Sequence, residues 1–148
     1  MNARLGLKAA RERLRAAGLE PTDHRVQVLR AVGNTIHPSS APEVLRAVQF
    51  KKDINRVTVY RILDLLVEHG LLNRLGLGER SQRFCLRGID TPEDHAHFHC
   101  TRCDSYMCLD CPVLPVDARV LADLAVNHVD VRLEGICPAC QRAQQEQR

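Results

Sequence analysis

The sequence predicts an α+β protein with an N-terminal winged helix-turn-helix followed by a smaller α/β domain. Apolar residues in the first 70 positions recur with helical spacing, whereas several later segments alternate apolar and polar side chains as strands do. The cysteines are also unevenly placed, because five of the seven lie between Cys85 and Cys111. We therefore expect two halves of different construction.

Four helices are predicted in the N-terminal half. The first covers residues 4–17 and ends at Gly18. Polar caps begin the other three, and these caps are Thr22, Ser39 or Ser40, and Asn55. The fourth helix, RVTVYRILDLLVEH, ends at Gly70, and its inward-facing residues are Val59, Ile62, Leu63, Leu66 and Val67.

A two-stranded hairpin is predicted after the fourth helix, from residues 71–77 and 81–86 with a turn near Gly78 and Glu79. Helices followed by such a hairpin form a winged helix, so residues 1–86 are assigned to this domain. The polar segment 87–94 is assigned as a hinge and residues 95–148 as the second domain. The elements predicted there are strands at 95–100, 105–109 and 128–135, a helix at 116–127 and a frayed tail at 141–148.

Charge differs between the two halves. Residues 1–84 hold 15 Lys and Arg against 8 Asp and Glu, whereas residues 85–148 hold 6 against 10, and the whole chain carries +3. A basic half attracts polyanions such as nucleic acid. An acidic half rich in Cys and His favours cations.

Neither a signal peptide nor a membrane span is expected. The first residues are charged, and the apolar runs are far shorter than the roughly 18 residues of a membrane span. We expect a cytoplasmic protein with no membrane partner. In a reducing compartment, an odd number of clustered cysteines indicates metal or redox chemistry in preference to disulfides.

Two C-x-x-C pairs predict a structural zinc site. The four cysteines are Cys100, Cys103, Cys137 and Cys140. Four soft thiolates leave no coordination position open, as in structural zinc sites. The alternative for either pair is a redox dithiol.

A second cluster predicts a second metal site. Its members are Cys85, His95, His97, His99, Cys108 and Cys111. The three histidines alternate along a predicted strand, so they share one face and at least two can bind the same ion. A mixed Cys and His set selects zinc, cobalt or nickel over iron or magnesium. The alternative is that some histidines are solvated and the cysteines are small core residues.

The outward face of the fourth predicted helix is a candidate DNA-reading surface. Thr58, Tyr60 and Arg61 lie near its N-terminus, where a recognition helix enters the major groove. Arg61 can read a guanine edge and Tyr60 can contact a thymine methyl group. Arg25 and Arg56 are candidates for phosphate contacts, as are Lys51 and Lys52. The alternative is a surface helix with solvated charges.

These residues together resemble the ferric uptake regulator family. The resemblance covers nearly the whole chain, and its runs are TDHRVQVL (22–29), HPSSAPEVL (37–45), INRVTVYRILDLLVEHGLL (54–72), HAHFHCTRC (95–103) and EGICPAC (134–140). It implies an α/β dimerisation domain and a metal-loaded homodimer that binds palindromic AT-rich double-stranded DNA operators. It also implies that Tyr60 and Arg61 contact bases.

The resemblance further implies a zinc-sensing member of the zinc uptake regulator branch, with two zinc ions per protomer. Cys85 stands where iron sensors have a carboxylate, and Cys108 stands where many members have a glutamate ligand. His37 lies close to a histidine that links the N-terminal domain to the metal in iron sensors. Cys85, His95 and His97 are thus the leading ligands, with Cys108 and His37 as alternates. The roles of His99 and Cys111 stay open.

Three other functions remain as alternatives. A zinc deaminase would need a His-x-Glu beside its cysteine pair and an open zinc position, so we expect no enzyme. A thiol-based redox sensor would use Cys85, Cys108 and Cys111. A third possibility is a family member that senses iron or another metal.

Overall fold

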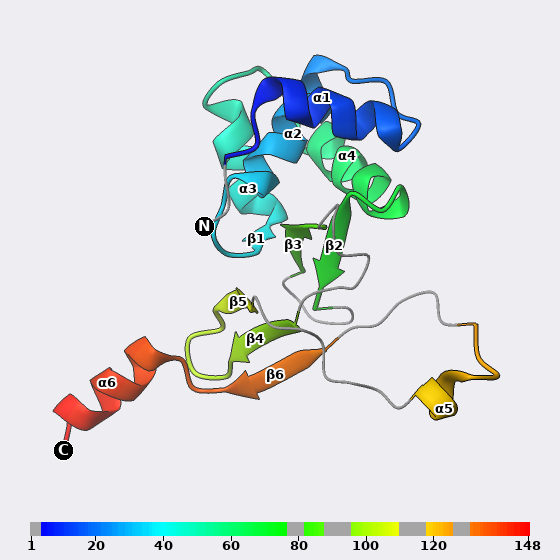
Figure 1. Cartoon of the computed structure of the whole chain (residues 1–148). Helices are drawn as coiled ribbons and strands as arrows, with labels where there is room; N and C mark the ends of the chain where they lie inside the picture. Colours follow the sequence, from blue (N-terminus) through cyan, green and yellow to red (C-terminus); the bar gives the residue numbers. More distant parts are fainter. Residues whose placement is uncertain (1–3, 77–81, 88–95, 110–117, 126–130) are drawn as a thin grey trace. The chain divides into compact units, whose positions relative to one another are not determined.

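The chain folds into two units, Met1–Arg87 and Gly88–Arg148. The computed structural model describes residues 4–76, 82–87, 96–109, 118–125 and 131–148 (Figure 1). Helices dominate the first unit, whereas a three-stranded sheet dominates the second. Both units together give the α+β class that the sequence predicts.

The four predicted helices are all present in the first unit, and their bounds are α1 (Leu7–Ala16), α2 (Asp23–Gly33), α3 (Ala41–Gln49) and α4 (Arg56–Glu68). The predicted caps are confirmed, because Thr22, Ser40 and Asn55 each accept a hydrogen bond from a backbone N–H three residues later. The first helix begins three residues later than predicted. Gly6 has an extended backbone (φ −72°, ψ 167°) and is the N-cap.

The apolar faces of these helices form one core. Val59, Leu63 and Leu66 of α4 are at most 1% exposed, and Val67 is partly buried against the same cluster. Burying each such side chain fully contributes about 1.5–3 kcal/mol. The packing of this core leaves the opposite face of α4 exposed.

The predicted hairpin consists of β2 (Leu72–Leu75) and β3 (Arg83–Leu86), which pair antiparallel. A short strand, β1 (Ser39–Ser40), pairs with β3 on its other side and was not predicted, because two residues carry no alternation. The predicted turn at Gly78 and Glu79 lies outside the described residues.

The second unit contains a three-stranded sheet in the order β5-β4-β6. Its strands are β4 (Ala96–Cys100), β5 (Tyr106–Leu109) and β6 (Arg132–Gly135), with β5 antiparallel and β6 parallel to β4. The parallel pairing places Cys100 opposite Gly135, so the two C-x-x-C segments follow the C-terminal ends of two neighbouring strands, at the same end of the sheet.

Two predictions in this unit were wrong. The helix predicted at 116–127 is α5 (Ala118–Leu121), and residues 122–125 are not helical. Val120 and Leu124 are 67% and 62% exposed, so this segment has no packed face to sustain further turns. Residues 116, 117, 126 and 127 lie outside the described part.

The tail, predicted to be frayed, instead continues a helix, α6 (Pro138–Glu146). Cys137 caps this helix, and Pro138 occupies its first turn, where proline is well tolerated. Gln, Arg and Ala, which favour helices, fill the rest.

In the described part of the chain, no helix has the length and apolar character needed to cross a membrane.

Candidate metal centre and nucleic-acid interface

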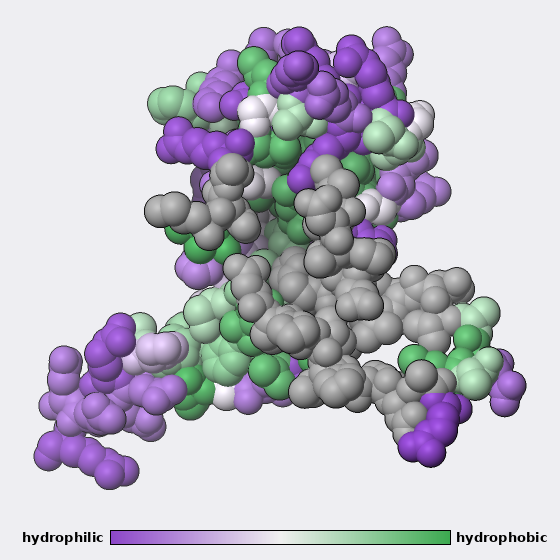
Figure 2. Space-filling model, viewed as in Figure 1, coloured by the Kyte–Doolittle hydropathy of each residue, from purple (hydrophilic) through white to green (hydrophobic). Residues whose placement is uncertain are grey.

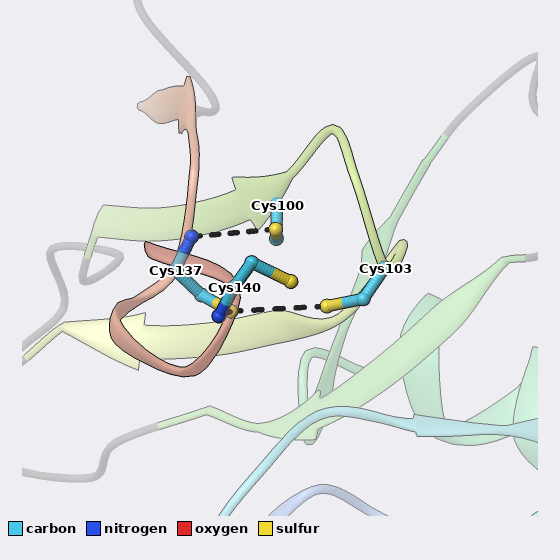
Figure 3. Close-up of side chains that lie close together, drawn as sticks. All are labelled: Cys100, Cys103, Cys137 and Cys140. Carbon is cyan, nitrogen blue, oxygen red and sulfur yellow. Dashed lines mark hydrogen bonds between the residues drawn. The ribbon is translucent and has the colours of Figure 1, made fainter. Parts of the chain in front are cut away.

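The four cysteines of the two C-x-x-C pairs come together in the second unit (Figure 3). Cys100 ends β4 and Cys103 lies in the turn after it, whereas Cys137 caps α6 and Cys140 lies in its first turn. All four sulfur atoms lie within 4.8 Å of one another. Figure 3 shows the side chains converging from the two segments.

The distances fit a tetrahedral zinc ion. Zinc–sulfur bonds of about 2.3 Å give sulfur–sulfur edges of about 3.8 Å in a regular tetrahedron. The Sγ atoms of Cys103 and Cys137 are 3.8 Å apart. Four thiolates fill a closed coordination shell, so this donor set fits a structural ion rather than a catalytic one.

Hydrogen bonds shift the pKa values of these thiols in opposite directions. The backbone N–H of Cys137 donates to Cys100 Sγ at 3.3 Å, and this bond is the main cause that lowers the pKa of Cys100 to about 6. The Ser105 hydroxyl, 3.1 Å from Cys103 Sγ, lowers the pKa of Cys103. By contrast, hydrogen bonding to Cys137 is the main cause that raises the pKa of Cys140 to about 12. Metal binding must therefore release protons from this cluster.

His99, whose role the sequence leaves open, lies in a polar network beside this centre. Its Nε2 is 2.6 Å from Asp104 Oδ1 and its Nδ1 is 3.4 Å from Glu134 Oε1. Its ring stacks on Tyr106, with centroids 4.5 Å apart. Arg132, and then His99, lower the pKa of Glu134. Nε2 therefore faces a carboxylate, whereas Nδ1 lies between Glu134 and the guanidinium of Arg132, whose Nη2 is 3.2 Å away.

The network also supports the first cysteine pair. Asp104 directly follows Cys103, has a left-handed backbone (φ 59°) and donates its N–H to the Cys100 carbonyl oxygen at 2.9 Å. Sequence reasoning missed the partners of His99. The adjacency of Asp104 to the cysteine pair was the available signal for one of them, whereas Glu134 faces His99 only because β6 runs parallel to β4.

The candidate residues for a second metal are divided between the units. In the second unit, His97 lies directly opposite Cys108 on β5, and their ligand atoms lie within 4.8 Å of each other. His97 is 2% exposed. In the first unit, Cys85 on β3 is 5% exposed, and His37 is exposed between α2 and β1. His95 and Cys111 lie outside the described residues.

The outward face of α4 carries the predicted DNA-reading residues. Arg61 is exposed, and Thr58 and Tyr60 are half-buried. The Arg56 guanidinium lies 5.2 Å from the centroid of the Tyr60 ring, so a cation–π contact holds these two side chains together. Thr58 donates through both its N–H and its hydroxyl to Asn55 Oδ1, which fixes the first turn of the helix.

Other basic groups of this unit already have protein partners. Arg25 donates to the Glu20 carbonyl oxygen at 3.1 Å, and Lys52 forms an ion pair with Asp23 at 2.9 Å. In Figure 2, hydrophilic side chains cover much of the visible face of the N-terminal helices. The excess of Lys and Arg over Asp and Glu in residues 1–84 suits a polyanionic partner. Among the described residues of this unit, α4 supplies the arginine stacked on a tyrosine.

A winged helix with this exposed face, joined to a domain that gathers four thiols, defines a metal-binding transcription regulator. Residues 16–135 match the model of the Ferric uptake regulator family. The chain belongs to this family, and it is a metal-responsive transcriptional regulator.

Named relatives cover most of the chain at low identity. The Peroxide operon regulator of Bacillus subtilis is 27% identical over 140 residues, which are 92% of this chain and 94% of that protein. The Peroxide-responsive repressor PerR of Staphylococcus aureus is 28% identical over 133 residues, 86% of each chain.

Solved structures share the fold. The Helicobacter pylori ferric uptake regulator superposes with a TM-score of 0.72 at 21% identity, covering 95% of this chain and 97% of that one. A zinc uptake regulator in complex with zinc and DNA superposes with a TM-score of 0.68 at 25% identity, covering 94% and 95%. The likeness to the DNA-bound zinc uptake regulator supports DNA binding by this chain.

Proposed function

We propose that this protein is a zinc-responsive repressor that acts as a homodimer in the cytoplasm. When loaded with zinc, it binds palindromic AT-rich operators and controls zinc-uptake genes. The observation that carries the choice of zinc is the set of donors offered to the second site, which includes the thiols of Cys85 and Cys108 and the imidazole of His97. Thiolate and imidazole together favour zinc over iron.

Each protomer holds two zinc ions in this proposal. The first is bound by Cys100, Cys103, Cys137 and Cys140 and cross-links the second unit. The second is bound by Cys85, His95 and His97 with one further ligand, for which Cys108 and His37 are the candidates. The pairing of His97 with Cys108 on neighbouring strands favours Cys108, because their ligand atoms lie within 4.8 Å of each other, whereas His37 is exposed.

The second ion would join residues from both units. Cys85 precedes and His95 follows the proposed hinge at residues 87–94, of which 88–94 lie outside the described part. Shared ligands would limit the orientations of the first unit and set the spacing of two recognition helices in a dimer. Exposed Val120, Leu124 and Leu133 in the second unit support a partner subunit there.

Metal analysis of the purified dimer tests the proposal. We expect two zinc ions per protomer, falling to one after mild chelation while DNA binding is lost in parallel. Cys85→Ala should retain the dimer and its first zinc but lose zinc-dependent DNA binding. A Cys85→Ala protein that still bound DNA in response to zinc would show that the regulatory site is misassigned.

The DNA interface is tested by two arginine variants. Arg61→Ala should cost about 1–3 kcal/mol of binding and relax the choice of base at one position. Arg25→Gln should weaken binding evenly across sequences and reduce the salt dependence by about one phosphate contact. Binding titrations at several salt concentrations against operator and scrambled DNA separate the two effects. Equal behaviour of both variants would contradict the assigned roles.

A redox sensor is the second candidate, and the names of the peroxide-responsive relatives favour it. Cys85, Cys108 and Cys111 would be the responding thiols. Peroxide treatment of the reduced, zinc-loaded dimer distinguishes the candidates. DNA release with disulfide formation and unchanged zinc content would favour redox sensing, whereas DNA binding that follows zinc occupancy alone would favour metal sensing.

A further inference from the structure

Asn73 and Cys85 form a buried polar pair on the wing. They lie directly opposite each other in the antiparallel pairing of β2 and β3, so their side chains share one face of the sheet. Leu72 and Phe84, their chain neighbours, belong to the helical core and therefore occupy the other face. The Nδ2 atom of Asn73 donates to Cys85 Sγ at 3.8 Å.

Burying an asparagine side chain on a strand costs free energy unless its amide is hydrogen-bonded. Asn73 is 7% exposed, and β-branched residues suit a strand better than asparagine does. The buried polar side chains in the described residues are Ser39, Asn73, His97 and His99. Ser39 donates to the Thr35 hydroxyl, His97 is a candidate metal ligand, and His99 lies in the polar network beside the four-cysteine centre. Asn73 is not itself a candidate ligand, and it directs its amide to the thiol of Cys85, which is one.

We propose that Asn73 is a positioning residue for the regulatory metal, which it serves by holding Cys85 and stabilising its thiolate. The inference rests on the proposed function, because it takes Cys85 as a zinc ligand. An amide N–H that donates to a negatively charged sulfur makes a charge-assisted hydrogen bond. It also restricts the side-chain rotation of Cys85, so less freedom is lost when the metal binds.

The consequence is that Asn73 adjusts the zinc affinity of the regulatory site. Groups that hydrogen-bond metal ligands change metal affinity by about 10–100-fold when removed. Asn73 therefore determines the free zinc concentration at which the regulatory site fills, without contacting zinc itself. The four-cysteine site has its own N–H donors within the second unit and is independent of Asn73.

Two variants test the role of the amide in the full-length dimer. Asn73→Leu keeps the branching of the side chain but is larger and has no donor, and Asn73→Asp has the same shape but replaces the donor by a carboxylate. Zinc affinity of the regulatory site is measured by competition with a chromophoric chelator, with the structural zinc retained. We expect both variants to bind at least about tenfold more weakly. The zinc concentration for half-maximal DNA binding should rise by the same factor.

Cobalt gives a readout that a purely structural role would not change. With Co²⁺ in the regulatory site, loss of the amide donor should shift the sulfur-to-cobalt charge-transfer band. Leu75→Val is the matched control, because Leu75 is 4% exposed on the same face of β2 and has no hydrogen-bonding side chain. It should retain the wild-type zinc affinity and spectrum. Thermal unfolding of the chelated proteins checks that all variants fold.

Comparison with Cys85→Ser separates the two possible failures. If Cys85→Ser keeps the regulatory zinc, the proposed function fails together with this inference. If Cys85→Ser loses that zinc while both Asn73 variants bind within twofold of wild type, only the inference fails. Tighter zinc binding by Asn73→Asp would also overturn it, because the carboxylate would then be acting as a direct ligand.

Discussion

The two units are stabilised by different kinds of interaction. In the described residues, every member of the apolar core cluster belongs to the first unit, from Leu5 to Phe84. The buried side chains of the second unit are instead few and largely polar or sulfur-bearing: Ala96, His97, His99, Cys100, Tyr106 and Cys137. Helix α6 buries no residue at all, and Figure 2 shows its hydrophilic surface.

This difference teaches why metal chemistry is concentrated in the second unit. A domain of about 60 residues buries little apolar surface and usually needs a metal, disulfides or a partner subunit. The apolar core of the first unit supports α4, and with it the proposed DNA-reading face, whether or not a metal is bound. The second unit depends on ligands, so metal occupancy can alter it without unfolding the first.

The largest expected effect comes from Cys137→Ser. Serine keeps the cap of α6 but removes one thiolate, so the structural zinc should be lost together with a binding free energy of order 10 kcal/mol. We expect the second unit to unfold and the dimer to dissociate while the helices of the first unit remain. Circular dichroism, zinc content and sedimentation measure this, with Ala139→Ser as the control. If Cys137→Ser remained folded and dimeric, the second unit would not depend on its structural zinc for stability.

Leu66→Ala tests how far the first unit depends on its apolar core. Leu66 is fully buried, so the cavity should lower the free energy of unfolding of the first unit by about 2–5 kcal/mol. The zinc content should not change. Val57→Ala on the same helix is the control, because Val57 is 58% exposed and its truncation should change stability by less than about 0.5 kcal/mol. Loss of zinc in Leu66→Ala would mean that the units are not independent.

His99→Leu tests how much the polar network around His99 stabilises the second unit. Loss of the hydrogen bonds to Asp104 and Glu134 should destabilise the zinc-loaded unit by about 1–2 kcal/mol, since both carboxylates can rehydrate. Zinc content should remain two ions per protomer. His69→Leu, at an exposed position in the first unit, is the control. A fall to one zinc ion would identify His99 as a ligand.

Lys52→Met should have the smallest effect and a defined pH dependence. Lys52 lowers the pKa of Asp23 below its ordinary value of 3.8, so the ion pair stabilises the folded state above that pH and stops doing so as pH falls through the lowered pKa. The variant should be slightly less stable at pH 7 and equal to wild type well below pH 3.8. Urea unfolding at low ionic strength measures the difference, because salt screens an exposed pair. A difference that persisted in acid would have another cause.

Local signals were enough to predict most of the first unit. A cap such as Thr22 or Asn55 and the apolar spacing of α4 act within a few residues of the chain, so the helices can be placed without knowledge of their neighbours. Strand β1 was missed because two serines become a strand only through pairing with β3. The early end of α5 and the extension of α6 likewise depend on packing and capping.

By itself, the sequence determined the helical core, the two C-x-x-C pairs and the type of donor at each candidate metal position. Ligand identity and spacing are local, and they limit the metals that can bind. Only the tertiary structure decided that His99 faces carboxylates while His97 pairs with Cys108, and that Asn73 donates to Cys85. Apart from Asp104, these partners lie 11 or more residues away in sequence, and the register of the strands sets which side chains meet.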